Sequence, residues 1–300
     1  MRYVAGLVLL AGFGCTRPAA EKLAVDPTLA RLVPADTVLL AGVRVQELRA
    51  TPLFRKLESR GGVRQMADSL AKSGFDVSRD VSVLVAASNG SATVVLAKGR
   101  FKIAGMEALN KSEYRGRTIY GNGDSSFTVL DETTAAAGSV AAVRAAIDRA
   151  AAGSGSGNAL LTAAEGLPIT SQIWAVGADL GALADRYVPR DGNIANARRL
   201  LKSTKSVTLS ADLRAGVKAT ITAACGNDQD AKLLNDTLRG ILGLGRLSVP
   251  EDRRELLRVY DGVKVERQEL TIRVEIDEPD ELLDRLIEMF TTPSTAVRRP

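Results

Sequence analysis

The stretch from Lys205 to Phe290 constrains the fold most, because strand-like and helix-like patterns follow one another there in a fixed order. Four segments alternate apolar and polar residues with a period of two, which predicts strands with one apolar and one polar face. These segments are 206–213, 217–224, 263–266 and 270–277. Connections of two or three residues, at 214–216 and 268–269, predict antiparallel hairpins.

Two helices are predicted on the apolar face of this sheet. Residues 228–244 and 281–290 carry apolar side chains at spacings of three and four, the pattern of amphipathic helices. Because a one-sided sheet and amphipathic helices bury each other's apolar surface, the block is expected to form a two-layer α+β unit. The apolar stripes are Ala231, Leu234, Leu238, Ile241 and Leu242 in the first helix, and Leu282, Leu283, Leu286, Ile287 and Phe290 in the second.

The first half of the chain shows the same order of elements. A strand is predicted over 37–45, a helix over 51–73, a hairpin over 81–97 and a second hairpin over 114–130. A strand over 133–138 and a helix over 140–151 follow. Two marker positions support the repeat, since Gly90 matches Gly216 and Tyr114-Arg115-Gly116 matches Tyr260-Asp261-Gly262.

The predicted fold is therefore α+β, with two tandem β-α-β-β-α-β-β-α units, mainly antiparallel sheets and helices packed on a face. Residues 32–152 form the first repeat, 153–157 a Gly/Ser connector, 158–290 the second repeat and 291–300 a disordered tail. A connector this short predicts that the two units pack against each other. The second face of the first sheet is apolar at Leu84 and Val95, which predicts a cover from helices over 180–187 and 194–201 or from a partner protein.

The N-terminus has the parts of a secretion signal. Arg2 is followed by an apolar run over 3–13, too short for the roughly 20 residues that span a bilayer. The run ends in Gly12-Phe13-Gly14-Cys15, which resembles the lipobox of bacterial lipoproteins, although Gly12 stands where leucine is usual. The resemblance implies a signal peptide over 1–14, an acylated Cys15 as lipidation site and membrane anchor, and a tether over 15–31. The alternatives are cleavage near Ala19-Ala20 and an uncleaved anchor.

The same resemblance implies a location. A protein anchored in this way lies in the bacterial cell envelope and faces the periplasm. Thr16 follows the cysteine where some inner-membrane lipoproteins carry aspartate, which favours the outer membrane over the inner one.

Composition argues against several kinds of chemistry. The chain contains no histidine, the commonest general base and metal ligand, and only two cysteines, Cys15 and Cys225. We therefore predict no catalytic residue, no cofactor-binding residue, no metal ligand and no enzymatic activity. The 40 basic and 35 acidic residues are not gathered into a basic groove with aromatic side chains, so no nucleic-acid partner is expected.

Several individual residues are given structural roles. Cys225 is predicted to be a buried, inert thiol and Trp174 a core residue. The glycine-rich run 240–245 lacks the lysine of a phosphate loop and follows a helix. The acidic pairs are expected to be solvated or to cap helices, and they are Asp131-Glu132, Asp277-Glu278 and Asp280-Glu281.

The chain as a whole resembles uncharacterised envelope lipoproteins built of repeated α+β units. This resemblance implies a lipid-anchored, non-enzymatic binding or scaffold protein whose partner is another envelope protein. An alternative is a carrier or chaperone for a lipid or other apolar ligand held between the repeats, which requires an enclosed apolar cavity. An envelope hydrolase ranks last, because base, nucleophile and metal ligands are poorly supplied.

Overall fold

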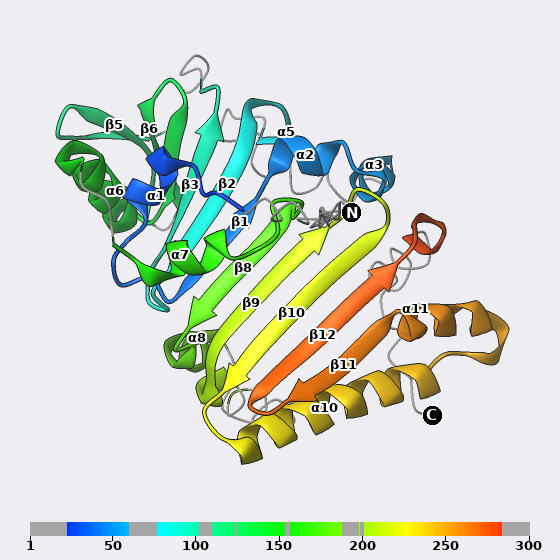
Figure 1. Ribbon diagram of the computed structural model, residues 1–300. Coiled ribbons are helices and arrows are strands. Elements are labelled where there is room, and N and C mark those ends of the chain that lie inside the picture. Colours follow the sequence, from blue (N-terminus) through cyan, green and yellow to red (C-terminus); the bar gives the residue numbers. More distant parts are fainter. Residues whose placement is uncertain are drawn as a thin grey trace, which may run out of the picture.

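The computed structural model describes residues 23–59, 77–101, 110–123, 125–153, 157–187, 198 and 201–283. Its strands form one 12-stranded sheet in the order β11-β12-β10-β9-β8-β1-β2-β3-β7-β6-β5-β4 (Figure 1). The two halves of the chain meet where β1 (Leu39–Val43) pairs with β8 (Ile173–Ala178), with Ala41 opposite Ala175. The halves therefore join edge to edge through backbone hydrogen bonds, and the separate sheets expected from the sequence are one sheet.

Every strand pairing among the described residues is antiparallel, which confirms the α+β class with an antiparallel sheet. The N-terminal half contributes β2 (Val81–Ser88), β3 (Thr93–Gly99), β4 (Lys111–Tyr114), β5 (Arg117–Asn122), β6 (Ser125–Asp131) and β7 (Thr134–Gly138). The C-terminal half contributes β9 (Thr204–Asp212), β10 (Val217–Cys225), β11 (Val263–Gln268) and β12 (Thr271–Glu278).

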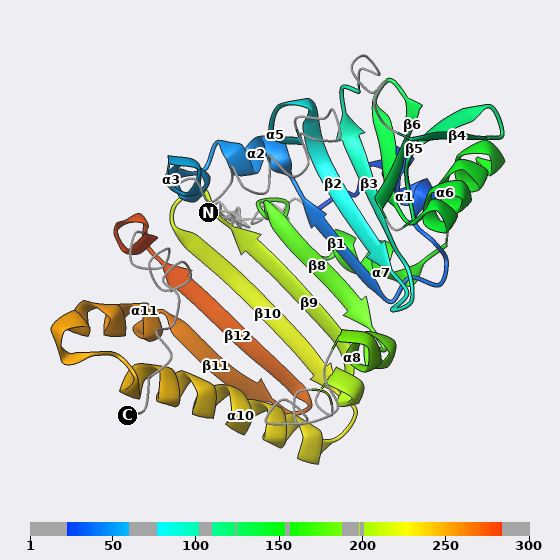
Figure 2. The same cartoon turned by 180° about the vertical axis from the view of Figure 1, so that it is seen from behind.

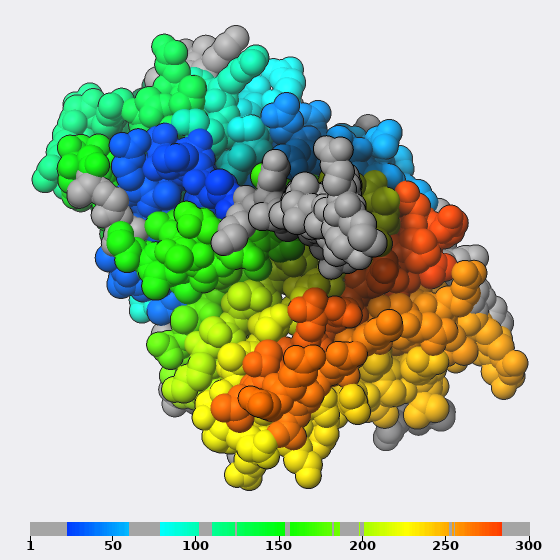
Figure 3. All heavy atoms as spheres, in the orientation of Figure 1, coloured from blue at the N-terminus to red at the C-terminus, as the bar shows by residue number. Residues whose placement is uncertain are grey.

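The front of the sheet, the side toward the viewer in Figure 1, carries helices over its N-terminal half. These are α1 (Pro27–Leu32), α6 (Val140–Ala152) and α7 (Ala159–Glu165), and their residues fill that half of the front in Figure 3. Their buried side chains meet those of β1, β2, β3 and β8 in the largest core cluster, as predicted for Trp174. The central members of this cluster are Leu29, Leu40, Val85, Leu96, Val143, Ala164, Trp174 and Val176.

The rear of the sheet carries α10 (Asp228–Leu247) at the C-terminal end. Leu234 and Leu238 pack there against Ile272, which confirms the predicted contact of this helix with the apolar face. Ile241, assigned to the same stripe, is instead 62% exposed. The 20-residue helix is about 30 Å long, whereas six residues of β11 span about 20 Å, so the helix extends past the edge strand.

Short helices border the rest of the rear side. Near β2 lie α2 (Val45–Arg49) and α5 (Val77–Asp80), α3 (Pro52–Ser59) follows α2, and α8 (Gly181–Tyr187) follows β8. The helix α11 (Leu257–Asp261) follows the 3-10 turn η1 (Glu251–Leu256) and leads into β11, and a second 3-10 turn, η2 (Asp280–Leu282), follows β12.

The fold begins before the end of the tether predicted over residues 15–31. Leu23 and Leu29 are buried, and the Leu23 amide donates to the Leu167 carbonyl at 2.9 Å. Helix α1 starts here because the Asp26 carboxylate accepts from the Thr28 and Leu29 amides and Pro27 occupies the first turn. This cap lies within the segment predicted as a tether, and residues 23–31 are part of the fold.

The second hairpin of the first half also differs from the expectation. Tyr114 belongs to β4, and Arg115-Gly116 turns the chain into β5, so the matched triplet Tyr260-Asp261-Gly262 at the end of α11 occupies a different place. Both Arg115 and Gly116 have positive φ, at 50° and 72°, as a tight hairpin requires. The predicted helices over 60–73, 194–197 and 284–290, the connector residues 154–156 and the tail lie outside the described residues.

Candidate binding faces

The front of the C-terminal half is a polar sheet surface, as the alternation predicted. Register pairs Thr208 with Thr222, and Ser210 with Thr220, which in turn faces Glu275. These side chains lie on the side opposite α10, because directly paired residues share a face. The predicted members of this polar face are Thr208, Ser210, Thr220, Thr222, Lys264, Glu266, Thr271, Arg273 and Glu275.

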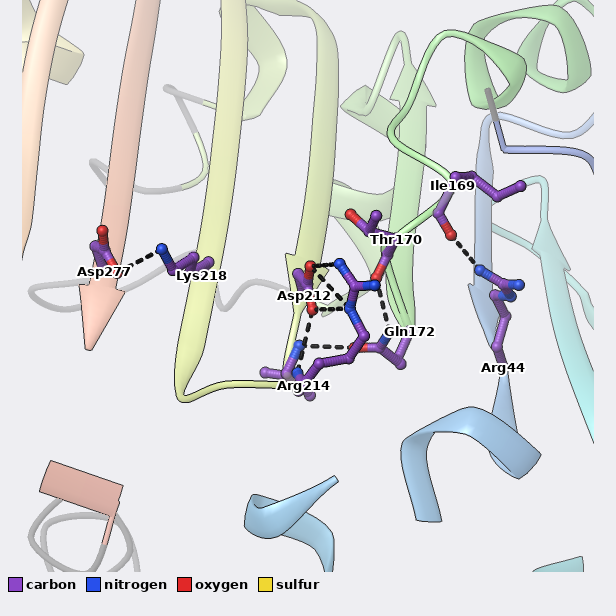
Figure 4. A network of polar contacts seen from close by, with 9 residues as sticks. Arg44, Ile169, Thr170, Gln172, Asp212, Arg214, Lys218 and Asp277 are labelled. Atoms are coloured by element: carbon purple, nitrogen blue, oxygen red, sulfur yellow. Dashed lines mark hydrogen bonds and ion pairs between the residues drawn. The ribbon is translucent and has the colours of Figure 1, made fainter. Parts of the chain in front are cut away.

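This polar face is hollowed where it meets the chain entering β8. The hollow has a volume of about 350 Å³. Figure 4 shows part of its wall, with side chains from β9, β10 and β12 and from the segment before β8. Its polar lining consists of Thr170, Ser171, Ser210, Asp212, Lys218, Thr220, Glu275 and Asp277.

The carboxylates of the hollow are matched by cations. The Arg214 guanidinium donates to both oxygens of Asp212, at 2.9 and 2.6 Å, and this contact holds the pKa of Asp212 below its usual value. Lys218 lies 3.6 Å from Asp277, and Arg273 lies 2.8 Å from Glu275. The hollow therefore offers hydrogen-bonding groups with its charges already neutralised, and it is suited to a polar contact more than to general-base chemistry.

A buried glutamine that the sequence reasoning missed fixes one wall of the hollow. Gln172 is fully buried, its amide nitrogen donates to the Thr170 carbonyl at 2.7 Å, and its side-chain oxygen accepts from the Leu213 amide at 2.6 Å. The Arg44 guanidinium donates to the Ile169 carbonyl beside it (Figure 4). Strand alternation gives no signal for Gln172, because it lies just before β8.

The rear of the sheet presents a second and larger candidate surface. Across β1, β8, β9 and β10 the rear positions are aliphatic and half-buried, and in the described part of the chain no helix crosses the middle of these strands (Figure 2). Apart from Lys205 at the start of β9, aromatic and charged side chains are absent from these positions. We call this surface the rear apolar face; it consists of Ala41, Val43, Ile173, Ala175, Val207, Leu209, Ala219, Ile221 and Ala223.

Each border of the rear apolar face is formed by a different element. On the C-terminal side α10 packs over β12, and at the end of β8 the Leu180 side chain lies against Gly177 and Val207. On the N-terminal side, Val45 of α2 and Phe101 belong to a small core cluster with Val81, Ala97 and Ala135.

The rear side of the first sheet is covered in part by other residues than the sequence predicted. Leu84 packs against the cluster containing Val45 and Phe101, and both Leu84 and Val95 are half-buried. Helix α8 follows β8 and does not supply that cluster, while residues 194–197, 199 and 200 of the other predicted helix lie outside the described range.

One acidic pair departs from its predicted solvated role. Glu278 is 1% exposed, and neither carboxylate oxygen has a hydrogen-bond partner. Burial, together with the charges of Asp277 and Asp261, raises the pKa of Glu278 to about 7. Glu278 lies two residues after Ile276 and so points to the same rear side of the sheet. This alternation is the sequence signal that could have predicted its burial. By contrast, Asp131 caps its turn as expected, accepting from the Thr133 amide at 2.8 Å.

The remaining candidates are quickly placed. Cys225 is 5% exposed, and burial raises the pKa of its thiol, which confirms the predicted buried cysteine. Cys15 lies outside the described residues. Within the described ranges, no three acidic or cysteine side chains are grouped so that they could hold a metal ion. In the same residues, no helix is long and apolar enough to cross a membrane.

Comparison with known proteins gives a likeness of fold. No protein-family model matches the chain, and no curated protein matches it. The crystal structure of form III of TP0453 matches with a TM-score of 0.50 at 10% identity, covering 88% of this chain and 98% of that one. Form I of TP0453 matches with a TM-score of 0.47 at 11% identity, covering 90% of this chain and 99% of the other. At this identity the likeness to form III concerns the fold alone.

Proposed function

We propose that the protein is a non-enzymatic binding protein of the bacterial cell envelope, tethered by an acylated Cys15, that holds its partner against the rear apolar face. The observation that carries this proposal is the half-buried aliphatic surface over β1, β8, β9 and β10, which no helix of the described residues crosses at its middle. Contiguous apolar surface rimmed by polar residues is a mark of an interaction site.

The anchor is proposed from the sequence. The run Gly12-Phe13-Gly14-Cys15 supplies the small residue and the cysteine that lipoprotein processing requires. Stable anchoring takes more than one acyl chain, and a triacylated cysteine meets that condition by itself. Thr16 favours the outer membrane over the inner one.

We also propose that the chain contains two tandem units related by duplication. From the β1–β8 seam, the strand order runs outward as β1-β2-β3-β7-β6 on one side and as β8-β9-β10-β12-β11 on the other. On each side of the seam, the next hairpin in the sequence (β2-β3 or β9-β10) lies beside the seam strand. A second hairpin lies outside it, with its later strand (β7 or β12) nearer the seam than its earlier strand (β6 or β11). The N-terminal unit adds β5 and β4 at its outer edge. This arrangement makes the rear faces of the two units continuous.

The open surface also bears on how a ligand would be held. A carrier with an enclosed cavity between the repeats was the alternative expected from the sequence. Because β1 and β8 share backbone hydrogen bonds, the described strands leave no space between two stacked sheets. Any apolar ligand would therefore lie on the sheet, and not between its halves.

The test uses a photo-crosslinking residue placed in the protein in living cells. Benzoylphenylalanine at Leu209, on the rear apolar face, is expected to give a crosslinked adduct. The same residue at Thr208, its neighbour on the front, is the matched control and should give little. If neither position, or both equally, yields an adduct, binding at the rear apolar face is wrong, whatever the partner.

A further inference from the structure

The composition of the rear apolar face distinguishes between kinds of partner. Interfaces between proteins are enriched at their centre in aromatic residues, methionine and arginine. None of these occurs on the rear apolar face, which consists of alanine, valine, leucine and isoleucine alone. Such a surface makes no directional contacts, and it suits a ligand that is itself aliphatic.

Register aligns these residues in straight rows across the strands. Ala41 faces Ala175, Ala175 faces Leu209, Leu209 faces Ile221 and Ile221 faces Val274. Neighbouring strands lie about 4.8 Å apart, so the part of a row on the four strands of the rear apolar face, β1, β8, β9 and β10, is about 14 Å long. A bilayer core about 30 Å thick holds two leaflets of acyl chains, so one chain spans roughly 15 Å. The row on the rear apolar face is therefore about as long as one acyl chain.

A neighbouring row ends the surface at its α8 border. It runs from Leu39 through Gly177 and Val207 to Ala223. A Cβ at Gly177 would meet the Leu180 side chain at 2.8 Å, so glycine allows Leu180 to lie low against the sheet. The alanine side chains are short, whereas those of Leu209 and Ile221 project further from the sheet. An extended acyl chain lying on the alanines would therefore be flanked by larger side chains.

Lys205 stands at one end of this surface. Lys205 begins the rear register of β9 at a bulge opposite Cys225, and its Cε lies 3.3 Å from the Cβ position of Gly226, just before α10. Lys205 is exposed and forms no ion pair with a described residue. The backbone amide of Asp179 donates to the Lys205 carbonyl, but the Asp179 carboxylate forms no ion pair with Lys205. An uncharged surface ending in one unpaired ammonium is complementary to an anionic amphiphile.

We infer that the rear apolar face seats the aliphatic chain of an anionic fatty-acyl amphiphile, with the head group beside Lys205. This inference rests on the proposed function, because it names the ligand of the same face. It can fail while the proposed function stands, since a crosslink from Leu209 to a protein would keep the face as a binding site and exclude the amphiphile.

The direct test is a fluorescence titration of the purified protein with cis-parinaric acid, a fluorescent fatty acid. Saturable binding is expected, and Leu209→Asp should weaken it by at least about tenfold, because a buried unpaired charge opposes an apolar ligand. The matched control Thr208→Asp, on the opposite face of the same strand, should leave the affinity within about twofold. Should Leu209→Asp fail to fold by circular dichroism, Ala175→Phe, which fills the row, replaces it.

The head group is tested with the methyl ester of the same acid. Lys205→Gln should weaken binding of the acid by up to about fivefold, the range of an exposed ion pair, and should leave binding of the ester unchanged. Equal effects on acid and ester would overturn the place of the head group.

Other occupants of the face would give different results. Absence of saturable binding overturns the inference. A wild-type dimer that Leu209→Asp converts to a monomer would assign the face to a second copy of the chain. A Leu209→Cys variant that resists maleimide without added lipid would show that another part of the chain covers it. Either result also excludes the amphiphile.

Discussion

Gly42 of β1 lies directly opposite Trp174 of β8, and the indole occupies the space that a side chain at Gly42 would need. A Cβ at Gly42 would stand 2.2 Å from Cε2 of Trp174, far inside van der Waals contact. Trp174 is 2% exposed and belongs to the front core. The pair therefore joins the two halves of the chain through packing as well as through the backbone ladder.

Gly42→Ala is expected to lower the free energy of unfolding by about 1–3 kcal/mol, because the new methyl group overpacks the seam. The measurement is urea denaturation. Gly243→Ala is the control, since nothing lies within 4 Å of its Cβ position in α10, and there the change should be neutral or stabilising by up to about 1 kcal/mol. A destabilisation at Gly243 as large as that at Gly42 would contradict the packing argument.

The sequence predicted the elements of the second half well because their signals are local. The alternation over 206–213 corresponds to β9, and the spacing over 228–244 to α10. Pairing across the seam was not predictable, since Leu39-Leu40 and Trp174 show only that β1 and β8 are apolar on both sides, without naming the neighbouring strand. Gln172 gave no pattern at all, whereas Glu278 shares the parity of Ile272 and was assigned to the surface by its chemistry alone.

The contrast between the two faces of β12 predicts a difference in stability. Ile272→Ala should cost about 2–5 kcal/mol, because the side chain is 1% exposed beneath α10. Lys264→Ala, on the front of β11, should cost under about 0.5 kcal/mol. Leu238 is half-buried in the same cluster as Ile272, so Leu238→Ala should fall between the two. Equal losses in thermal denaturation at Ile272 and Lys264 would show that the sheet is not one-sided there.

The lipid anchor is tested by processing in the cell. Cys15→Ser is expected to leave a precursor that is neither acylated nor cleaved after Gly14, because the thiol is the acceptor of the diacylglycerol. Labelling with radioactive palmitate and mass spectrometry of the N-terminus are the measurements. Cys225→Ser is the control and should be labelled normally, since that thiol is buried in the fold. A mature N-terminus beyond Cys15 in the wild-type protein would contradict the anchor.

The buried carboxyl of Glu278 predicts a stability that falls as pH rises. The native state raises the pKa of Glu278 from 4.5 to about 7, so between these values it binds the proton more tightly than the unfolded chain does. Stability from this group is therefore present in full below about pH 4.5 and is lost as pH rises toward 7, by on the order of 3 kcal/mol. Glu278→Gln keeps the neutral shape and should flatten this dependence in urea denaturation at pH 5 and pH 8. Glu266→Gln, exposed on the front of β11 and not among the charges that raise the pKa of Glu278, is the control and should keep the slope. An unchanged slope in Glu278→Gln would show that another group titrates in this window.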